Sequence, residues 1–364
     1  MRIGLLTFCQ GTNYGGILQC YATHKLLEAK GHHVEEIVIA GSSSNIVSRL
    51  YNKMRTLSSP VQFMKEIGDR LKKQRGSVTS NVNKELLAVF DKFRNENLRL
   101  SPLLGVESIG EYANRHYDVI IVGSDQVWTD IYDKQSIYFI GWSPSFRGKK
   151  IALAACSAHN HVNKNRNRRL KPLLDSFNII TVRDNRTADL VESIIKKRPS
   201  IVGDPSTFYD YKEFLTDKVE CPYILVYILG NEIKEGHAKA LNTIKGKYGN
   251  IKVKLVTVGR CDESLCSSVD EILFACSPQD WVDMIAKAKC VYTDSFHAVL
   301  FSLKFGTPFV AYYTEAIRAS RLKYLKEFYK LPNIVESVKE ISIDNIYSKK
   351  VDVNSKEFYT IIDI

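Results

Sequence analysis

Three side chains that could bind an anion or transfer a proton follow predicted strands of this sequence. Asp125 comes shortly after one apolar run, Arg183 directly after a second and His297 shortly after a third. In open α/β sheets, ligands bind beyond the carboxyl ends of the strands. A guanidinium there suits a phosphate or carboxylate, and an imidazole with a carboxylate can move protons. The pattern predicts a site that binds an anion and carries out acid–base chemistry, with His297 and Asp125 as the acid–base pair.

His297 falls in the first turn of a predicted helix, where the helix dipole favours a neutral imidazole that can accept a proton. Lys304 lies two turns further along roughly the same face. The alternative is a histidine whose ring is satisfied by a local hydrogen bond. For Arg183 the alternative is a structural ion pair with Asp184 or Asp204, because an unpaired buried guanidinium is costly.

A glycine-containing loop follows the first predicted strand. Asn13-Tyr14-Gly15-Gly16 precedes a run with helical spacing, so its backbone amides could approach a ligand at a helix N-terminus that favours an anion. The alternative is a simple tight turn. The loop lacks the spacing of the dinucleotide-binding fingerprint and of the nucleoside triphosphatase phosphate loop, which disfavours both of those functions.

A second loop carries groups suited to a sugar. Asp125, Gln126 and Trp128 offer a carboxylate, an amide and an aromatic ring, which match the hydroxyl groups and the C–H face of a carbohydrate. The alternative is an aspartate that caps a helix beside a core tryptophan. We predict that this loop and the Asn13–Gly16 loop bind an acceptor.

Composition limits the class of protein. The chain has 364 residues, 45% of them hydrophobic and 25% charged, which is typical of a globular protein with two or three domains. The formal net charge is +11, which favours anionic partners, but no nucleic-acid recognition motif is present. Much of the excess lies at 41–76 and 164–171, away from the strand ends. We interpret it as attraction to an anionic inner membrane face or to a lipid-diphosphate acceptor.

The sequence shows no signal peptide and no run of about 18 apolar residues, so we expect a cytoplasmic protein. Its eight cysteines are too dilute for a disulfide scaffold, and most of them should be buried in a reduced protein. No dense cluster of Asp, Glu and His predicts a metal site.

Strand and helix patterns alternate along the chain. An α/β domain is predicted over 1–210, interrupted by a basic, mostly helical insertion at about 41–100. A second α/β domain follows over 221–335, and then a tail over 336–364. We predict two Rossmann-like domains that face each other across a cleft, with the polar strand-end residues lining it.

Taken in order, these segments resemble the polysaccharide pyruvyl transferase family. The resemblance runs from about residue 3 to 330. It implies a GT-B-like fold and the transfer of pyruvate from phosphoenolpyruvate, as a ketal, to a sugar of a cell-surface glycan (exopolysaccharide or capsule) or its precursor. The matching stretches are Asn13–Gln19 with Tyr21 and Ala22, Asp118–Trp128, Val182–Asp184, Asp204–Ser206, Thr293–His297, Phe305–Phe309 and Ser320–Leu322.

The resemblance also implies roles for residues. Arg183 would hold the anionic groups of the donor and His297 would be catalytic. We expect Ser295, Lys304 and Arg321 to bind the donor with Arg183. The acceptor would be a lipid-linked or nucleotide-linked sugar, no metal or redox cofactor would be required, and the protein would contact the inner membrane face peripherally.

The chain departs from the family pattern at two places. Many members have an arginine two residues before the histidine, where this chain has Ser295, and a Ser–aromatic–Gly element where it has Cys156-Ser157-Ala158. The first change removes a donor-binding cation. Lys304, Arg318 or Arg321 could supply that charge, although the two arginines could equally lie on a solvated face.

Two other functions stay open. A GT-B glycosyltransferase would place Arg183, His297 and Arg321 around the diphosphate of a nucleotide sugar. A non-enzymatic protein that binds an anionic glycan or nucleic acid would use the basic segment 41–76 and would be indifferent to His297→Ala.

Overall fold

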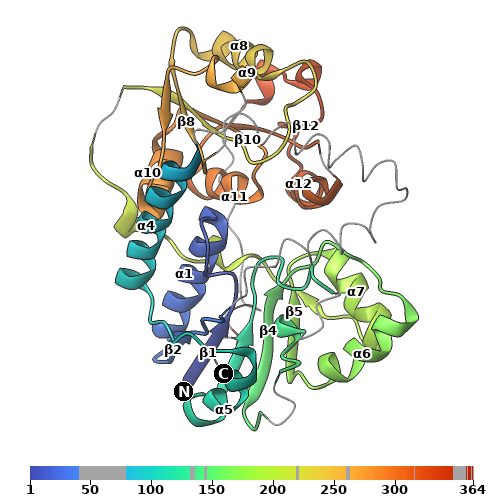
Figure 1. Cartoon of the computed structure of the whole chain (residues 1–364). Helices are drawn as coiled ribbons and strands as arrows, with labels where there is room; N and C mark the ends of the chain where they lie inside the picture. Colours follow the sequence, from blue (N-terminus) through green and yellow to red (C-terminus); the bar gives the residue numbers. More distant parts are fainter. Residues whose placement is uncertain are drawn as a thin grey trace. The chain divides into compact units, whose positions relative to one another are not determined.

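The computed structural model describes residues 1–40, 79–131, 136–142, 146–218, 221–259, 263–314, 316–346, 358, 360, 361 and 363. The side chains of 79–83 and 316–318 lie outside that description. The chain divides into two compact units, each built on its own sheet (Figure 1). The first unit comprises Met1–Thr7, Gly31–Val82 and Arg99–Ser200, and the second comprises Phe8–Lys30, Asn83–Leu98 and Ile201–Ile364.

The sheet of the first unit has six strands in the order β2-β1-β3-β4-β5-β6. Its central strand β3 (Val119–Val122) is buried along its whole length, as expected for a parallel strand covered on both faces. The helices α6 and α7 pack against each other (Figure 1). The other elements are β1 (Arg2–Leu6), β2 (His33–Glu36), β4 (Lys149–Ala155), β5 (Ile179–Val182), β6 (Ser200–Ile201), α5 (Val106–His116), α6 (Lys164–Asp175), α7 (Asn185–Ile195) and the short 3₁₀ helix η1 (Ile137–Phe139).

The sheet of the second unit has the order β12-β11-β10-β7-β8-β9, and all of its strand pairs are parallel. Its core gathers apolar side chains of β7, β8, β10 and α8. The elements are β7 (Tyr223–Tyr227), β8 (Lys252–Val256), β9 (Glu271–Leu273), β10 (Cys290–Thr293), β11 (Phe309–Tyr312), β12 (Ile334–Val335), α8 (His237–Tyr248), α9 (Glu263–Cys266), α10 (Pro278–Lys287), α11 (Phe296–Phe305), α12 (Ala316–Tyr329) and the 3₁₀ helices η2 (Pro205–Thr207), η3 (Lys212–Phe214), η4 (Val338–Glu340) and η5 (Ile343–Asn345).

The early helix α1 (Tyr14–Glu28) also belongs to the second unit, as does α4 (Thr79–Asn97) from Asn83 onward. Aromatic packing holds them there. The ring of Tyr14 stacks on Trp281 of α10, with ring centres 5.3 Å apart, and lies 4.9 Å from Phe90 of α4. The Tyr14 hydroxyl donates a hydrogen bond to the carbonyl of Cys276 at 2.7 Å. Buried rings of this kind contribute large apolar areas, so α1 is bound firmly to α10.

The predicted α/β class is confirmed. The helix α8 begins only at His237, because Glu235 and Gly236 have positive φ values of 72° and 94°, which a helix cannot accommodate. The domains predicted along the sequence are contiguous, whereas the two compact units interleave. Of the insertion predicted at 41–100, residues 41–78 lie outside the described residues and α4 is helical. Among the described residues, no helix combines the length and apolar character needed to cross a bilayer.

Candidate functional site

His297 lies in the first turn of α11, in the second unit. The helix begins where the Ser295 hydroxyl accepts a hydrogen bond from the backbone N–H of Ala298 at 3.4 Å. The imidazole is buried, and its Nε2 lies 3.5 Å from Oδ2 of Asp204. That separation allows electrostatic attraction, but Nε2 has no hydrogen-bond partner among the described residues. The buried nitrogen therefore faces a carboxylate without a hydrogen bond to it.

Asp204 is held by its own turn. It precedes η2, and its Oδ1 accepts hydrogen bonds from the backbone N–H of Ser206 at 3.0 Å and from the Ser206 hydroxyl at 2.7 Å. The carboxylate is buried. Because one oxygen is fixed by Ser206, the other is presented to the imidazole of His297 in one orientation. An aspartate so placed can orient a histidine and stabilise its protonated form.

The glycine loop packs against this histidine. A Cβ atom on Gly15 would lie 1.9 Å from Nδ1 of His297 and 2.2 Å from its Cγ, so no other residue fits there without moving the ring. The loop starts α1 with Asn13 as the cap, whose side chain accepts a hydrogen bond from the N–H of Gly16 at 3.2 Å. Two of the motifs singled out in the sequence, 282 positions apart, thus meet at one point of the second unit.

An arginine that the sequence pattern does not single out fixes the start of this loop. Arg94 of α4 is buried and donates hydrogen bonds to the carbonyl of Gly11 at 2.7 Å and to that of Cys9 at 3.3 Å. It is also bonded to Asp91 on its own helix. Its sequence neighbourhood shows only a charged helix, so no signal identified this role.

In the first unit, the ends of β3, β4 and β5 carry a second arrangement. Arg183 follows β5, and its guanidinium lies 3.4 Å from Oδ1 of Asp125, with both side chains buried. Asp125 has a left-handed backbone (φ 65°), and its carbonyl accepts a hydrogen bond from the N–H of Cys156 at 3.0 Å. Asp184 and Asp204 were the predicted ion-pair partners of Arg183, whereas the structure pairs Arg183 with Asp125.

Asp184 instead caps the N-terminus of α7. Its Oδ1 accepts hydrogen bonds from the N–H and the hydroxyl of Thr187 at 2.8 and 2.7 Å, which caps α7. Its other oxygen accepts from the thiol of Cys156 at 3.2 Å. In the same strand-end loop, burial lowers the pKa of His159, a residue that the sequence analysis did not select.

The residues predicted to bind the acceptor differ in what they can offer a sugar. Trp128 is fully buried, stacks on Phe139 with ring centres 5.3 Å apart and donates to the carbonyl of Tyr138 at 2.8 Å. A sugar needs an exposed ring face, and neither Trp128 nor the buried Tyr14 offers one in this structure. Gln126 differs, because its buried amide nitrogen has no hydrogen-bond partner among the described residues.

The remaining donor-binding predictions stay untested. Lys304 donates to the carbonyl of Thr207 at 2.9 Å and lies 5.9 Å from the ring centre of Tyr211. The guanidinium of Arg321 lies 5.5 Å from the ring centre of Phe296, so it neighbours the residue next to His297. The side chain of Arg318 lies outside the described residues.

No group of three or more His, Cys, Asp or Glu side chains suited to a metal occurs in the part of the chain that the structure describes. Four of the free cysteines are buried, Cys221 is exposed and Cys276 is half-buried, while Cys266 is disulfide-bonded and so departs from the expected reduced state. The buried free cysteines are Cys9, Cys20, Cys156 and Cys290.

The two six-stranded parallel sheets with their helices define an α/β protein with a GT-B-like fold. A putative UDP-N-acetylglucosamine 2-epimerase from Listeria monocytogenes matches 93% of this chain and 85% of its own, with 12% identity and a TM-score of 0.52. MnaA from S. aureus, solved with UDP, matches 100% and 95%, with 12% identity and a TM-score of 0.54. At this identity the similarity concerns the fold alone.

The family follows from the sequence itself. The model of the polysaccharide pyruvyl transferase family matches residues 13–315, and the chain belongs to that family. The matched range includes the glycine loop, both aspartate pairs and His297. A comparison with curated proteins found no match.

Proposed function

We propose that this protein transfers pyruvate from phosphoenolpyruvate to a sugar of a cell-surface glycan, or to its precursor, and so forms a ketal. Membership of the polysaccharide pyruvyl transferase family supports the reaction class. The observation that carries the proposal is the buried His297, set between the carboxylate of Asp204 and the glycine loop with its Nε2 unbonded. An imidazole paired with a buried carboxylate is suited to proton transfer.

The reaction needs one proton on carbon and the loss of two from oxygen. His297 delivers a proton to the methylene carbon of phosphoenolpyruvate, which becomes a methyl group and leaves the neighbouring carbon electrophilic. A sugar hydroxyl attacks that carbon and gives up its proton to a base. A second hydroxyl then closes the ketal as phosphate leaves with the remaining proton. Asp204 stabilises the protonated imidazole at the start of the cycle.

Arg183 is the proposed clamp for the donor. A guanidinium binds a carboxylate or phosphate through paired N–H groups. In this structure its guanidinium faces Asp125. A donor anion that takes the place of this carboxylate frees Asp125 to accept the proton of the attacking hydroxyl. We assign the supporting donor contacts to Ser295, Lys304 and Arg321.

We assign the binding of the acceptor to Gln126 and to the Asn13–Gly16 loop. The unpartnered amide nitrogen of Gln126 can donate to a sugar hydroxyl, and the Asn13–Gly16 loop flanks His297. We propose a lipid-linked or nucleotide-linked sugar as acceptor. The protein would act in the cytoplasm, with peripheral contact at the inner membrane face, and the residues named here supply the proton transfer and the anion binding without a redox step.

The test measures phosphate release from phosphoenolpyruvate together with ketal formation, detected by mass spectrometry, on acceptors from the organism's own glycan locus. Wild-type protein should turn over and His297→Gln should not. His237→Gln is the matched control, because His237 is equally buried in the same unit but is bonded to the hydroxyl of Tyr292 at 3.0 Å. Hydrolysis of a nucleotide sugar with no use of phosphoenolpyruvate would instead identify a glycosyltransferase.

A further inference from the structure

One side of α11 faces the segment that carries Asp204. His297, Phe301 and Lys304 are spaced at four and then three residues, so they lie along one stripe of the helix. At the first point of the stripe, Nε2 of His297 lies 3.5 Å from Oδ2 of Asp204. At the last point, two turns on, the Lys304 ammonium donates a hydrogen bond to the carbonyl of Thr207 at 2.9 Å. The turn around η2 is therefore attached to α11 at both ends of the stripe.

A buried tyrosine fixes the far end of the same segment. Tyr211 is fully buried, and its ring centre lies 5.0 Å from that of Phe301, the middle residue of the stripe. The Tyr211 hydroxyl donates to the carbonyl of Leu18 at 2.8 Å, and the Lys304 ammonium lies 5.9 Å from the centre of the Tyr211 ring. A cation over an aromatic ring is attracted to its face. Lys304 thus contacts two parts of the segment, the carbonyl of Thr207 and the ring of Tyr211.

The bond from Lys304 to Thr207 acts on Asp204 because the residues between them form one short turn. The carbonyl of Asp204 accepts hydrogen bonds from the N–H of Thr207 at 2.9 Å and from its hydroxyl at 2.7 Å. Pro205 restricts the backbone between the two residues. A shift of the Thr207 carbonyl therefore moves the carboxylate of Asp204 relative to His297.

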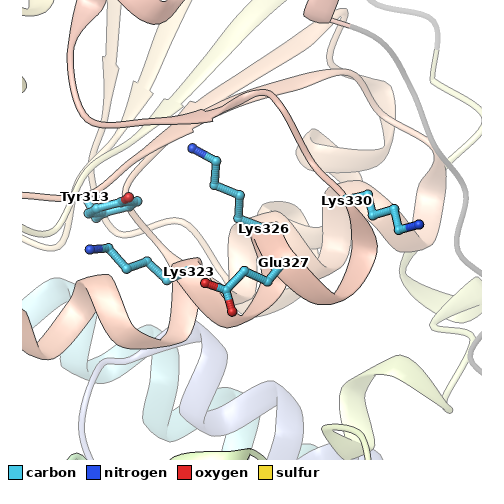
Figure 2. A pocket seen from close by; sticks show the side chains of 5 residues that line it. All are labelled: Tyr313, Lys323, Lys326, Glu327 and Lys330. Atoms are coloured by element: carbon cyan, nitrogen blue, oxygen red, sulfur yellow. The ribbon is translucent and has the colours of Figure 1, made fainter.

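A surface lysine of the same unit shows a different kind of contact. A hollow of about 500 Å³ along α12 is lined by Tyr313, Lys323, Lys326, Glu327 and Lys330 (Figure 2). Lys323 lies 3.9 Å from the carboxylate of Glu336, and both side chains are about half exposed. An ion pair of that kind contributes little to stability. The bond of Lys304 instead joins a helix to a backbone carbonyl, and so it fixes a position of the chain.

We propose that Lys304 is a positioning residue for proton transfer, and that its bond to Thr207 sets the separation between Asp204 and His297. The inference rests on the proposed function for the step that this separation serves. An ammonium has three N–H groups, so a bond to Thr207 is compatible with the donor contact proposed for Lys304. The two roles differ in kinetics, because loss of a binding contact raises KM whereas loss of positioning lowers kcat.

Steady-state kinetics of Lys304→Met tests the positioning role. Methionine keeps an unbranched side chain of similar length but cannot donate to the carbonyl of Thr207. The kcat should fall about 10- to 100-fold, since displacement of a reacting group by about 1 Å can cost 10²-fold. Lys304→Arg keeps a donor for the carbonyl and should restore most of kcat. A raised KM for phosphoenolpyruvate with wild-type kcat in Lys304→Met would overturn the proposal in favour of a donor contact alone.

Two other lysines of the second unit provide controls. Lys287→Met breaks the bonds that join the end of α10 to Thr216 and to Asp283. Lys323→Met removes one positive charge at the hollow. Both variants should keep the wild-type kcat. A fall in either control equal to that in Lys304→Met would overturn the proposal in favour of a general effect of stability or charge.

A readout without turnover separates this proposal from the proposed reaction. The ring ¹H–¹³C resonances of His297, assigned with His297→Gln, should shift in Lys304→Met and should stay in place in the two controls. Unchanged His297 resonances in Lys304→Met would overturn the positioning role. Shifted resonances in that variant, together with no pyruvyl transfer by the wild-type protein, would contradict the proposed reaction and still support the positioning of His297 through Lys304.

Discussion

Each unit buries one aspartate against one nitrogen base, at nearly the same separation. In the first unit Arg183 lies 3.4 Å from Asp125, and in the second His297 lies 3.5 Å from Asp204. The guanidinium carries its charge at every accessible pH, so its burial requires a permanent counter-charge. The imidazole can lose its charge, so its pairing is conditional.

The permanent charge of Arg183 and the titratable charge of His297 suit the two pairs to different functions. A permanently charged pair is suited to hold an anion, because the arginine can exchange one carboxylate for another. The His297–Asp204 pair is suited to move a proton, because the imidazole can be buried in either its protonated or its neutral form. We therefore propose that the first unit binds the anionic donor and that His297 of the second unit delivers the proton to carbon, and variants can test the two roles separately.

The largest effect is expected from His297→Gln, which removes the titratable group while keeping a polar side chain. Pyruvyl transfer should fall by about 10²- to 10⁴-fold, the usual contribution of general acid–base catalysis, and the free energy of unfolding should change by less than about 1 kcal/mol. Steady-state kinetics and urea unfolding measure the two quantities. A wild-type kcat in this variant would contradict the proposed role of His297 in proton transfer.

Asp125→Asn should lower stability as well as activity, because it removes the carboxylate that pairs with a buried guanidinium. We expect a loss of about 3 kcal/mol in the free energy of unfolding, measured in urea. Asp118→Asn is the matched control in the same unit. Asp118 pairs with Arg2 at 2.8 Å, but both side chains are largely exposed, so its loss should cost less than about 1 kcal/mol. Equal losses would contradict a special role for the buried pair.

Gly15→Ala tests the geometry of the conditional pair without changing its chemistry. The added methyl group must displace the His297 ring, and a shift of about 1 Å can cost 10²-fold in rate. Gly246→Ala is the control, because its Cβ would meet only Ile343 at 3.5 Å, an ordinary contact. The rate of ketal formation is the measurement, and an unchanged rate in Gly15→Ala would show that the ring position is not critical.

The smallest effect concerns pH. Burial and a hydrogen bond to Glu213 raise the pKa of Tyr209, in the second unit, to about 12. A pKa raised above the unfolded value of about 10 means that this stabilisation is complete below pH 10 and is lost as pH rises toward 12. Tyr209→Phe should flatten the fall in stability over that window, as followed by urea unfolding at stepped pH. An identical slope in the variant would rule out a contribution from Tyr209.

Much of the fold could be predicted from sequence, because strands such as Val119–Val122 are short apolar runs whose ends are polar. The same argument placed Arg183, Asp125 and His297 at strand ends. It could not find the Arg183–Asp125 pair, because partners on different strands leave no periodic signal. Nor could it distinguish a buried Trp128 from an exposed one, since both contexts favour the same residue.

The contact of Gly15 with His297 was also beyond sequence reasoning. A glycine in a loop indicates either a backbone conformation or a close approach, and only coordinates show what approaches. Sequence reasoning also could not assign α1 to the second unit, because its partner Trp281 lies on a helix far along the chain. Local pattern predicts elements, and long-range packing decides where they belong.

That packing has a consequence for synthesis. The Tyr14 hydroxyl meets its acceptor, the carbonyl of Cys276, across a separation of 262 residues. A ribosome adds about 5–20 residues per second, so α1 emerges roughly 10–50 s before its partners on α10. During that interval the aromatic side chains of α1 have no α10 to pack against. The nascent chain should therefore depend on chaperones early, and the second unit can be completed only when its last helices arrive.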